Sequence, residues 1–298
     1  MIPETRFSSE LLQIADVPEP LQTALRKSLH PKDIVSLLVY KPTETASGVT
    51  SAAKLLAVTN QGFVFVESGS DESSHITKCG FDAVLLIEVS TLLLYGHLKI
   101  HYVENKRCKS LSMEHNVVAD DVYRRAVALM LEGIADRSSA APASSGTDAV
   151  NLKSWPLPIR DAAAASILST NVPNAAAWWP SVHGGFGYEL APMGAVLAVD
   201  DQIVVVIVEQ AGPWNRVREA VTYGTIATYI PSNRLAELHP EHSPKFTIFE
   251  LEMHARHGGE RFSFMVPRTH EAPVEVAVEA ALSTSRAKGW NDKIFGNH

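Results

Sequence analysis

Histidine is the residue type whose spacing in this chain comes nearest to a metal site. Of the 12 histidines, His97 and His101 are four residues apart in a segment with the residue types of a β-strand. Strand side chains alternate, so both imidazoles, which are common zinc ligands, point to one face. Lys99 lies between them on that face, where a cation would repel a metal ion. We interpret the face as solvated and predict no metal site and no cofactor.

Other reactive residue types also lack the setting that their chemistry needs. The glycine-rich sequence at His183–Leu190 has no preceding strand and following helix to aim backbone N–H groups at a phosphate. Cys79 and Cys108 stand far apart and outside any CxxC pattern, which indicates buried structural thiols. Nothing resembles a nucleophile elbow or a dinucleotide fingerprint. We therefore expect no catalytic residues, and a hydrolytic enzyme is the least favoured function.

Tryptophans are the first candidates for contact with a partner. Trp178 and Trp179, followed by Pro180, form the most concentrated aromatic patch, and Trp214 follows Gly-Pro in a predicted loop. Tryptophan at such places either packs a neighbouring element onto the core or anchors an interface. We keep both interpretations for the pair and expect exposure mainly of Trp214.

Basic residues in one predicted turn are the second candidates. Lys106, Arg107 and Lys109 follow Glu104-Asn105 within a few residues. Such a cluster can contact acidic lipid headgroups or another anionic ligand. Three charges are too few for firm membrane anchoring alone.

Composition narrows the classes of partner. The 298 residues are 46% hydrophobic, enough for two domains with a core each. Lys and Arg total 26 against 33 Asp and Glu, which argues against nucleic-acid binding because that requires concentrated positive charge. The first residues have no signal-peptide core, and no run approaches the roughly 18 apolar residues of a membrane span. We expect a cytoplasmic protein.

An internal repeat organises the sequence. The hairpin pattern at Leu55–Glu67 returns at Val196–Glu209, with polar turns that contain Asn60 and Asp201. Two further strand-rich segments then correspond, residues 76–89 and 217–230. A second hairpin follows in each copy, and we expect the chain to reverse at residues 104–106 in the first and at Gly258-Gly259 in the second.

A helix is predicted to close each copy. The first spans Val117–Ile134 with an apolar stripe, and the second spans Ala272–Arg286. The stripe of the first consists of Val118, Val122, Ala126, Leu129 and Met130. A short helix and an opening strand precede each hairpin series, at 20–29 and 34–40 in the first copy and at 160–168 and 185–190 in the second.

The segment between the copies is rich in Ser, Ala, Pro and Gly without hydrophobic period, which is typical of a linker. We therefore predict a first domain at 1–134, a linker at 135–152 and a second domain at 153–298. Apolar residues directly after the linker favour packing between the domains.

The first copy resembles a known family. An apolar strand that ends in Thr-Asn (Leu55–Asn60), an apolar strand that ends in Glu (Phe63–Glu67), the sequence LLLYGHLKIHY at Leu92–Tyr102 and a final helix resemble the bacterial pleckstrin-homology-like (PH-like) domains, particularly the YokE-like group. The resemblance covers roughly residues 30 to 135. The second copy is similar through the internal repeat but lacks the Tyr95-Gly96 junction.

The resemblance implies a mainly β fold of two tandem PH-like barrels. Each would have about seven antiparallel strands in two nearly orthogonal sheets, closed by a C-terminal helix. The family often has a basic residue in the turn after Thr-Asn, whereas this chain has Gln61-Gly62 there. The loss of that residue removes support for an anionic ligand at this turn.

These observations favour a non-catalytic adaptor or scaffold that binds a protein or peptide at loops or open sheet edges. The alternative is a peripheral membrane or acidic-lipid-binding module that uses Lys106, Arg107 and Lys109. The open edges also allow a homodimer. The identity of the partner lies beyond the sequence.

Overall fold

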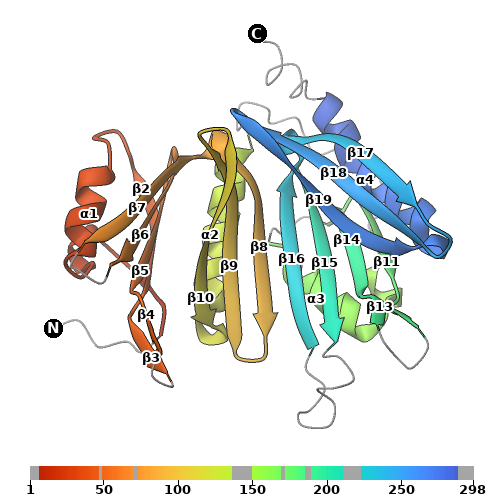
Figure 1. The fold of residues 1–298 in the computed structure, drawn as a ribbon, viewed down its shortest axis with the longest axis horizontal. Coiled ribbons are helices and arrows are strands. Elements are labelled where there is room, and N and C mark those ends of the chain that lie inside the picture. Colours follow the sequence, from red (N-terminus) through yellow and green to blue (C-terminus); the bar gives the residue numbers. More distant parts are fainter. Residues whose placement is uncertain are drawn as a thin grey trace.

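The computed structural model describes residues 7–46, 49–69, 73–135, 150–168, 172–184, 189–199, 201–210 and 223–287. The protein is mainly β, with antiparallel sheets packed against short helices (Figure 1). No helix within these ranges is long and apolar enough to cross a membrane.

The first half begins with a five-stranded sheet of order β1-β2-β5-β6-β7. Apolar runs rich in β-branched and aromatic residues form its inner strands, and helix α1 packs on its outer face. Its elements are β1 (Ser9–Leu11), α1 (Leu21–Ser28), β2 (Val35–Lys41), β5 (Lys54–Thr59), β6 (Gly62–Ser68) and β7 (Ser74–Gly80), with the small hairpin β3 (Glu44–Ala46) and β4 (Val49–Ser51) between β2 and β5.

The chain then turns through a 3-10 segment, η2 (Phe81–Ala83), into three antiparallel strands and a helix. These elements are β8 (Val84–Leu92), β9 (Tyr95–Glu104), β10 (Arg107–Asn116), the 3-10 segment η3 (Val117–Ala119) and α2 (Asp120–Ile134). Asn105 and Lys106 both have positive φ, so a two-residue turn joins β9 to β10 where the sequence predicted a reversal.

From its first helix on, the second half repeats the order of elements of the first, and the small pair β12 (Val182–His183) and β13 (Glu189–Ala191) takes the place of the hairpin β3–β4. β1 has no counterpart among the described residues of the second half. Its elements are η4 (Leu152–Ser154), α3 (Leu157–Ser166), β11 (Ala175–Trp179), β14 (Met193–Val199), β15 (Gln202–Gln210), β16 (Tyr223–Pro231), η7 (Ser232–Arg234), β17 (Leu235–His242), β18 (Phe246–Ala255), β19 (Gly258–Pro267), η8 (Arg268–His270) and α4 (Glu271–Ala287).

A single seven-stranded sheet joins the two halves. Its order is β10-β9-β8-β16-β15-β14-β11, so the junction is the antiparallel pairing of β8 with β16. Six residue pairs form it, from Gly224 opposite Leu92 to Tyr229 opposite Ile87. Because backbone hydrogen bonds cross the junction, the halves share a sheet as well as side-chain contacts.

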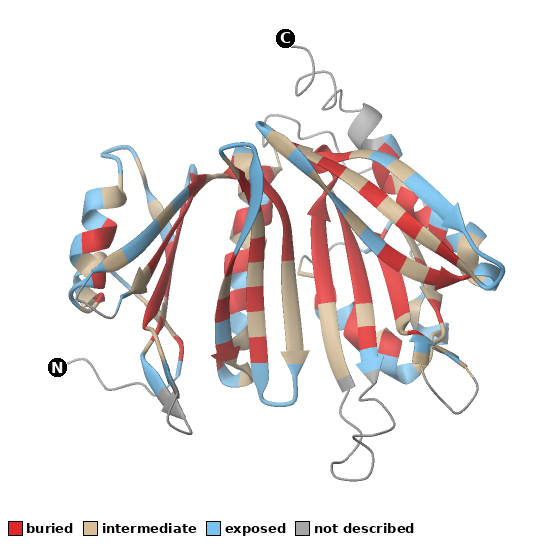
Figure 2. Cartoon of the chain, viewed as in Figure 1, coloured by how far each residue is buried: buried red, intermediate tan, exposed pale blue. Residues whose placement is uncertain are grey.

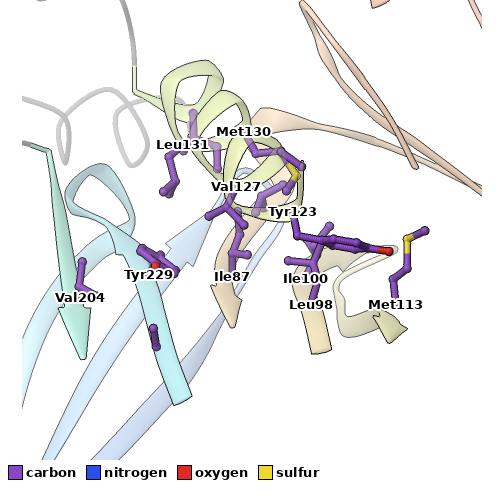
Figure 3. Packing of buried hydrophobic residues seen from close by; sticks show 14 of the residues in the cluster. Ile87, Leu98, Ile100, Met113, Tyr123, Val127, Met130, Leu131, Val204 and Tyr229 are labelled. Atoms are coloured by element: carbon purple, nitrogen blue, oxygen red, sulfur yellow. The ribbon is translucent and has the colours of Figure 1, made fainter. Parts of the chain in front are cut away.

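Layers form on both faces of this sheet (Figures 1 and 2). Helix α2 covers β8–β10, with Val127 beside Ile87 and the ring of Tyr123 extending over Ile100 towards Met113 (Figure 3), while α3 packs on β14 and β15. The three-stranded sheet β17-β18-β19 and α4 cover the opposite face of the second half. The buried strands therefore have apolar side chains on both faces.

Four expectations from the sequence need correction. Cys108, which we expected to be buried, is exposed near the start of the edge strand β10. None of the sheets closes into a barrel, because β8 pairs with β16 and the strands of the two halves thereby form one open seven-stranded sheet. Val118 is 77% exposed, since α2 starts at Asp120 and its buried face is set by Tyr123, Ala126 and the residues one turn on. The β18–β19 reversal lies before Gly258, which opens β19.

The second-half opening strand also differs from the prediction. Residues 185–188 lie outside the described part of the chain, and the strand that occupies the corresponding place in the element order is β11. The predicted linker likewise lies mostly outside it, at 136–149. The boundaries at 134 and 152 stay a prediction.

Candidate functional site

A polar groove of about 560 Å³ opens in the first half, where the β5–β6–β7 sheet parts from β9 and β10. Its walls come from five strands. The residues that set its chemistry are Lys54, Glu67, Thr77, Tyr102, Glu104 and Lys109.

The register of the strands explains why charged residues meet there. Lys54 lies opposite Glu67 and Glu67 lies opposite His75, so the three form one row across β5, β6 and β7. The next row inward on the same face contains Phe65 and Thr77. The groove therefore combines charged side chains with the ring of Phe65 and the hydroxyl of Thr77.

One end of the groove is fixed by Lys54. Its Nζ donates a hydrogen bond to the Ser112 carbonyl of β10 at 3.0 Å and lies 3.6 Å from carboxylate oxygens of both Glu67 and Glu114. Lys54 is buried, so these contacts compensate its lost hydration. They tie β5 to β10 and hold the two walls in place.

The mouth of the groove is formed by β9 and β10. Tyr102 is buried with its ring edge toward Phe63, at a centroid distance of 6.2 Å, and burial raises the pKa of its phenol. Lys109 forms an ion pair with Glu104, and the hydrogen bond that Lys109 donates to that carboxylate raises the pKa of Lys109. Both charges stay at the surface.

Two strand edges without a partner border the groove. Within the described residues, β7 pairs only with β6, and β10 pairs only with β9. His75 and Ile76 on β7 and residues 107–110 on β10 are exposed. An edge strand presents backbone N–H and C=O groups on its outer side that can pair with an added strand. On β10 the Ser112 carbonyl already accepts a hydrogen bond from Lys54.

The charges of the groove balance. Lys54 and Lys109 face Glu67 and Glu104, with His75 beside them. No group of three or more His, Cys, Asp or Glu side chains in the described ranges could hold a metal ion. The groove therefore suits a ligand of mixed polarity that can form backbone hydrogen bonds.

The structure separates the predicted tryptophans. Trp179 is 0% exposed: it stacks on Phe264 at 5.7 Å and donates a hydrogen bond from Nε1 to the Pro192 carbonyl at 3.1 Å. Trp179 is a core residue of β11, and its buried side chain has no surface that a partner could contact. Trp178 on the opposite face of β11 is partly buried, and Trp214 lies outside the described residues.

The basic candidates lie around the β9–β10 turn. Lys106 occupies the turn with a φ of 62°, Arg107 opens β10, and both are exposed. Lys109 lines the groove with Glu104 as its partner. The structure thus places one of the three beside the groove, where its charge is already balanced.

The histidine face is half-buried, and its side chains contact carboxylates. His101 Nε2 lies 3.0 Å from Glu88 on β8, and its Nδ1 lies 3.6 Å from Glu260 on β19. Lys99 also contacts Glu88, at 3.4 Å. The contact between His101 and Glu260 bridges the two halves of the molecule, a role that local spacing did not indicate.

Sequence reasoning missed two features. The groove depends on long-range register, which no local pattern reveals. The β8–β9 turn exposes four consecutive apolar residues, Leu92, Leu93, Leu94 and Tyr95, and Leu93 is 71% exposed. Four consecutive apolar residues fit an exposed tip and a buried strand equally well, so their sequence alone did not identify the tip.

Comparison with known proteins identifies no relative: no family model, curated protein or solved structure matches this chain.

Proposed function

We propose that the protein is a non-catalytic module that binds an extended polypeptide segment in the groove between β7 and β10. The observation that carries the proposal is the position of the groove between two unpaired strand edges. Extended peptides gain affinity from such edges through main-chain hydrogen bonds, and side-chain pockets add specificity.

The proposed architecture is a tandem pair of PH-like units. Support comes from the repeated order of four strands, a 3-10 turn, three strands, a 3-10 turn and a helix, which runs from β2 to α2 and again from β11 to α4 apart from two small hairpins. In each unit the final helix packs over the core. An adaptor role follows if each unit contributes a different contact.

The ionisable groups of the groove support binding over catalysis. Lys54 and Lys109 are held by carboxylates, and the thiol of Cys79, near the end of β7, is buried. Burial raises the pKa of Cys79 to about 12, so the reactive thiolate is scarce at neutral pH. An enzyme would instead need a nucleophile and a base within reach of each other.

Selection of peptides on the intact chain tests the proposal. A display library of random 12-residue peptides would be selected on the wild type, and the recovered peptides measured by fluorescence anisotropy. We expect micromolar binding that Ser110→Phe, which fills the groove mouth from an exposed position, weakens at least tenfold. Ser36→Phe, on an exposed site of β2, is the matched control. Failure to recover peptides, or equal affinity for both variants, would refute the proposal.

A second candidate, contact with a lipid surface, is favoured by the apolar tip at Leu92–Tyr95. A projecting tip can enter the headgroup region, as other apolar surface elements do. The basic turn at Lys106 and Arg107 cannot assist it, because β9 has ten residues and separates the two by about 30 Å. This candidate predicts flotation with phosphatidylcholine vesicles that Leu93→Ser abolishes. Absence of flotation by the wild type would remove it.

A further inference from the structure

The molecule contains an internal example of the binding mode that the groove requires. The strand β8 belongs to the first half and pairs antiparallel with the outer edge of β16, which belongs to the second half. β16 holds the place in its half that β7 holds in the first, because each strand runs directly into the 3-10 turn before the next sheet. The edge of β16 is therefore occupied, whereas the corresponding edge of β7 borders the groove.

The surroundings of the two edges also correspond. Met253 is the eighth residue of β18, as Tyr102 is of β9. Glu260 is the third residue of β19, as Lys109 is of β10. In the second half these places receive the added strands: Glu260 lies 3.6 Å from His101, and Met253 shares a core cluster with Leu85 and Leu86 of β8. In the first half Tyr102 and Lys109 line the groove.

We propose, on the basis of the proposed function, that the groove binds its partner by strand addition: an extended segment of another polypeptide pairs antiparallel with β7, as β8 pairs with β16. Counting back from the two 3-10 turns sets the register. Tyr229 corresponds to Lys78 and Gly224 to Ser73, so the added strand covers residues 73–78.

The groove chemistry indicates an exchangeable partner with polar side chains. Where the second half has Ala255 at the end of β18, the first has Glu104 at the end of β9, and Lys109 is paired with it. The added strands in the second half pack Leu85 and Leu86 into an apolar cluster, and one polar contact, between His101 and Glu260, lies beside it. A strand in the groove would instead meet balanced charges beside Thr77. Such an interface stays hydrated and releases its ligand more readily.

A second copy of this chain is an unsuitable partner. A second copy would have to supply β17, the strand of the second half that is equivalent to β8. The sixth residue of β17 is Pro240, whereas the sixth residue of β8 is Val89. In the internal junction Val89 lies opposite Ala227, whose counterpart on β7 is Ile76. Proline has no N–H to donate and is a common guard of edge strands, so β17 is protected against head-to-tail pairing.

Residue-resolved hydrogen exchange on the intact chain tests strand addition. The probe is the tightest 12-residue peptide recovered by display, added at ten times its Kd. We expect amide exchange within residues 74–78 to slow about tenfold at alternate positions, because only every second residue of an antiparallel strand faces its neighbour. Amides of β10 should be unaffected.

Each outcome is informative. Peptide binding that Ser110→Phe weakens, without alternate protection on β7, would leave the proposed function standing and overturn strand addition. Slowed amide exchange on β10 alone would show that the peptide pairs with β10, and it would also overturn strand addition to β7. Self-association of the peptide-free wild type that protects residues 74–78 would replace the partner with a second copy. Failure to recover any peptide would refute the proposed function itself.

Discussion

Arg234 is expected to couple the stability of the two halves. Its side chain lies in η7 of the second half, is 6% exposed, and donates hydrogen bonds of 2.8 Å to the carbonyls of Val84 and Phe81 in the first half. Burial lowers the pKa of Arg234 to about 10, which reflects the cost of removing the guanidinium from water.

The size of the effect follows from the groups left unpaired. Arg234→Met keeps most of the side-chain volume but leaves two buried carbonyls without donors, at about 1–3 kcal/mol each. Relief of the guanidinium's desolvation offsets part of this loss. We expect the free energy of unfolding to fall by about 3 kcal/mol.

Urea unfolding with two probes provides the assay. All five tryptophans lie at residue 155 or later, so fluorescence reports the second half, whereas far-UV circular dichroism reports both. Since β8 pairs with β16, we expect coincident transitions in the wild type and a shift of both in Arg234→Met.

A matched control uses the other arginine that reaches η2. Arg256 contacts Asp82 at 2.9 Å but is 68% exposed, so Arg256→Ala should cost less than about 1 kcal/mol. Equal effects of the two substitutions, or a wild type whose two probes report separate midpoints, would refute the reasoning.

Two further predictions concern acid and helix packing. Burial lowers the pKa of His97, and Lys54 with other neighbours outweighs burial to lower the pKa of Glu114. Both groups bind protons less readily in the folded state than in the unfolded state. Their contribution to the free energy of unfolding is therefore complete above the ordinary pKa, which is 6.5 for His97 and 4.5 for Glu114. It is lost as the pH falls from that value through the lower pKa of the folded state. We expect the urea midpoint to decline below pH 6.5 and again below 4.5, and His97→Gln to remove the first step; an unchanged first step would contradict this assignment. Gly133→Ala in α2 should destabilise by about 1–3 kcal/mol despite the higher helix propensity of alanine, because its Cβ would lie 2.1 Å from the Phe81 ring. Thermal unfolding measures this change, and a raised Tm would show that Phe81 can move aside.

The local elements were largely predictable from the sequence. Apolar runs of strand-forming residues, interrupted by polar turn residues, placed the hairpins β5–β6 and β14–β15, and helical periodicity placed α2 and α4 within a few residues of their ends. These patterns depend on neighbouring residues alone. For the same reason they could not distinguish a buried apolar run from the exposed tip at Leu92–Tyr95.

Tertiary structure decided how the elements combine. A strand sequence shows which face is apolar but not which strand lies at its edge, so the β8–β16 junction and the free edge of β7 were beyond reach. The groove needs Lys54, Glu67 and Lys109 to meet from three strands, and Trp179 is buried because sheet β17-β18-β19 folds over β11. The sequence thus determined the strands, hairpins and helices, whereas long-range register determined the shared sheet and the site.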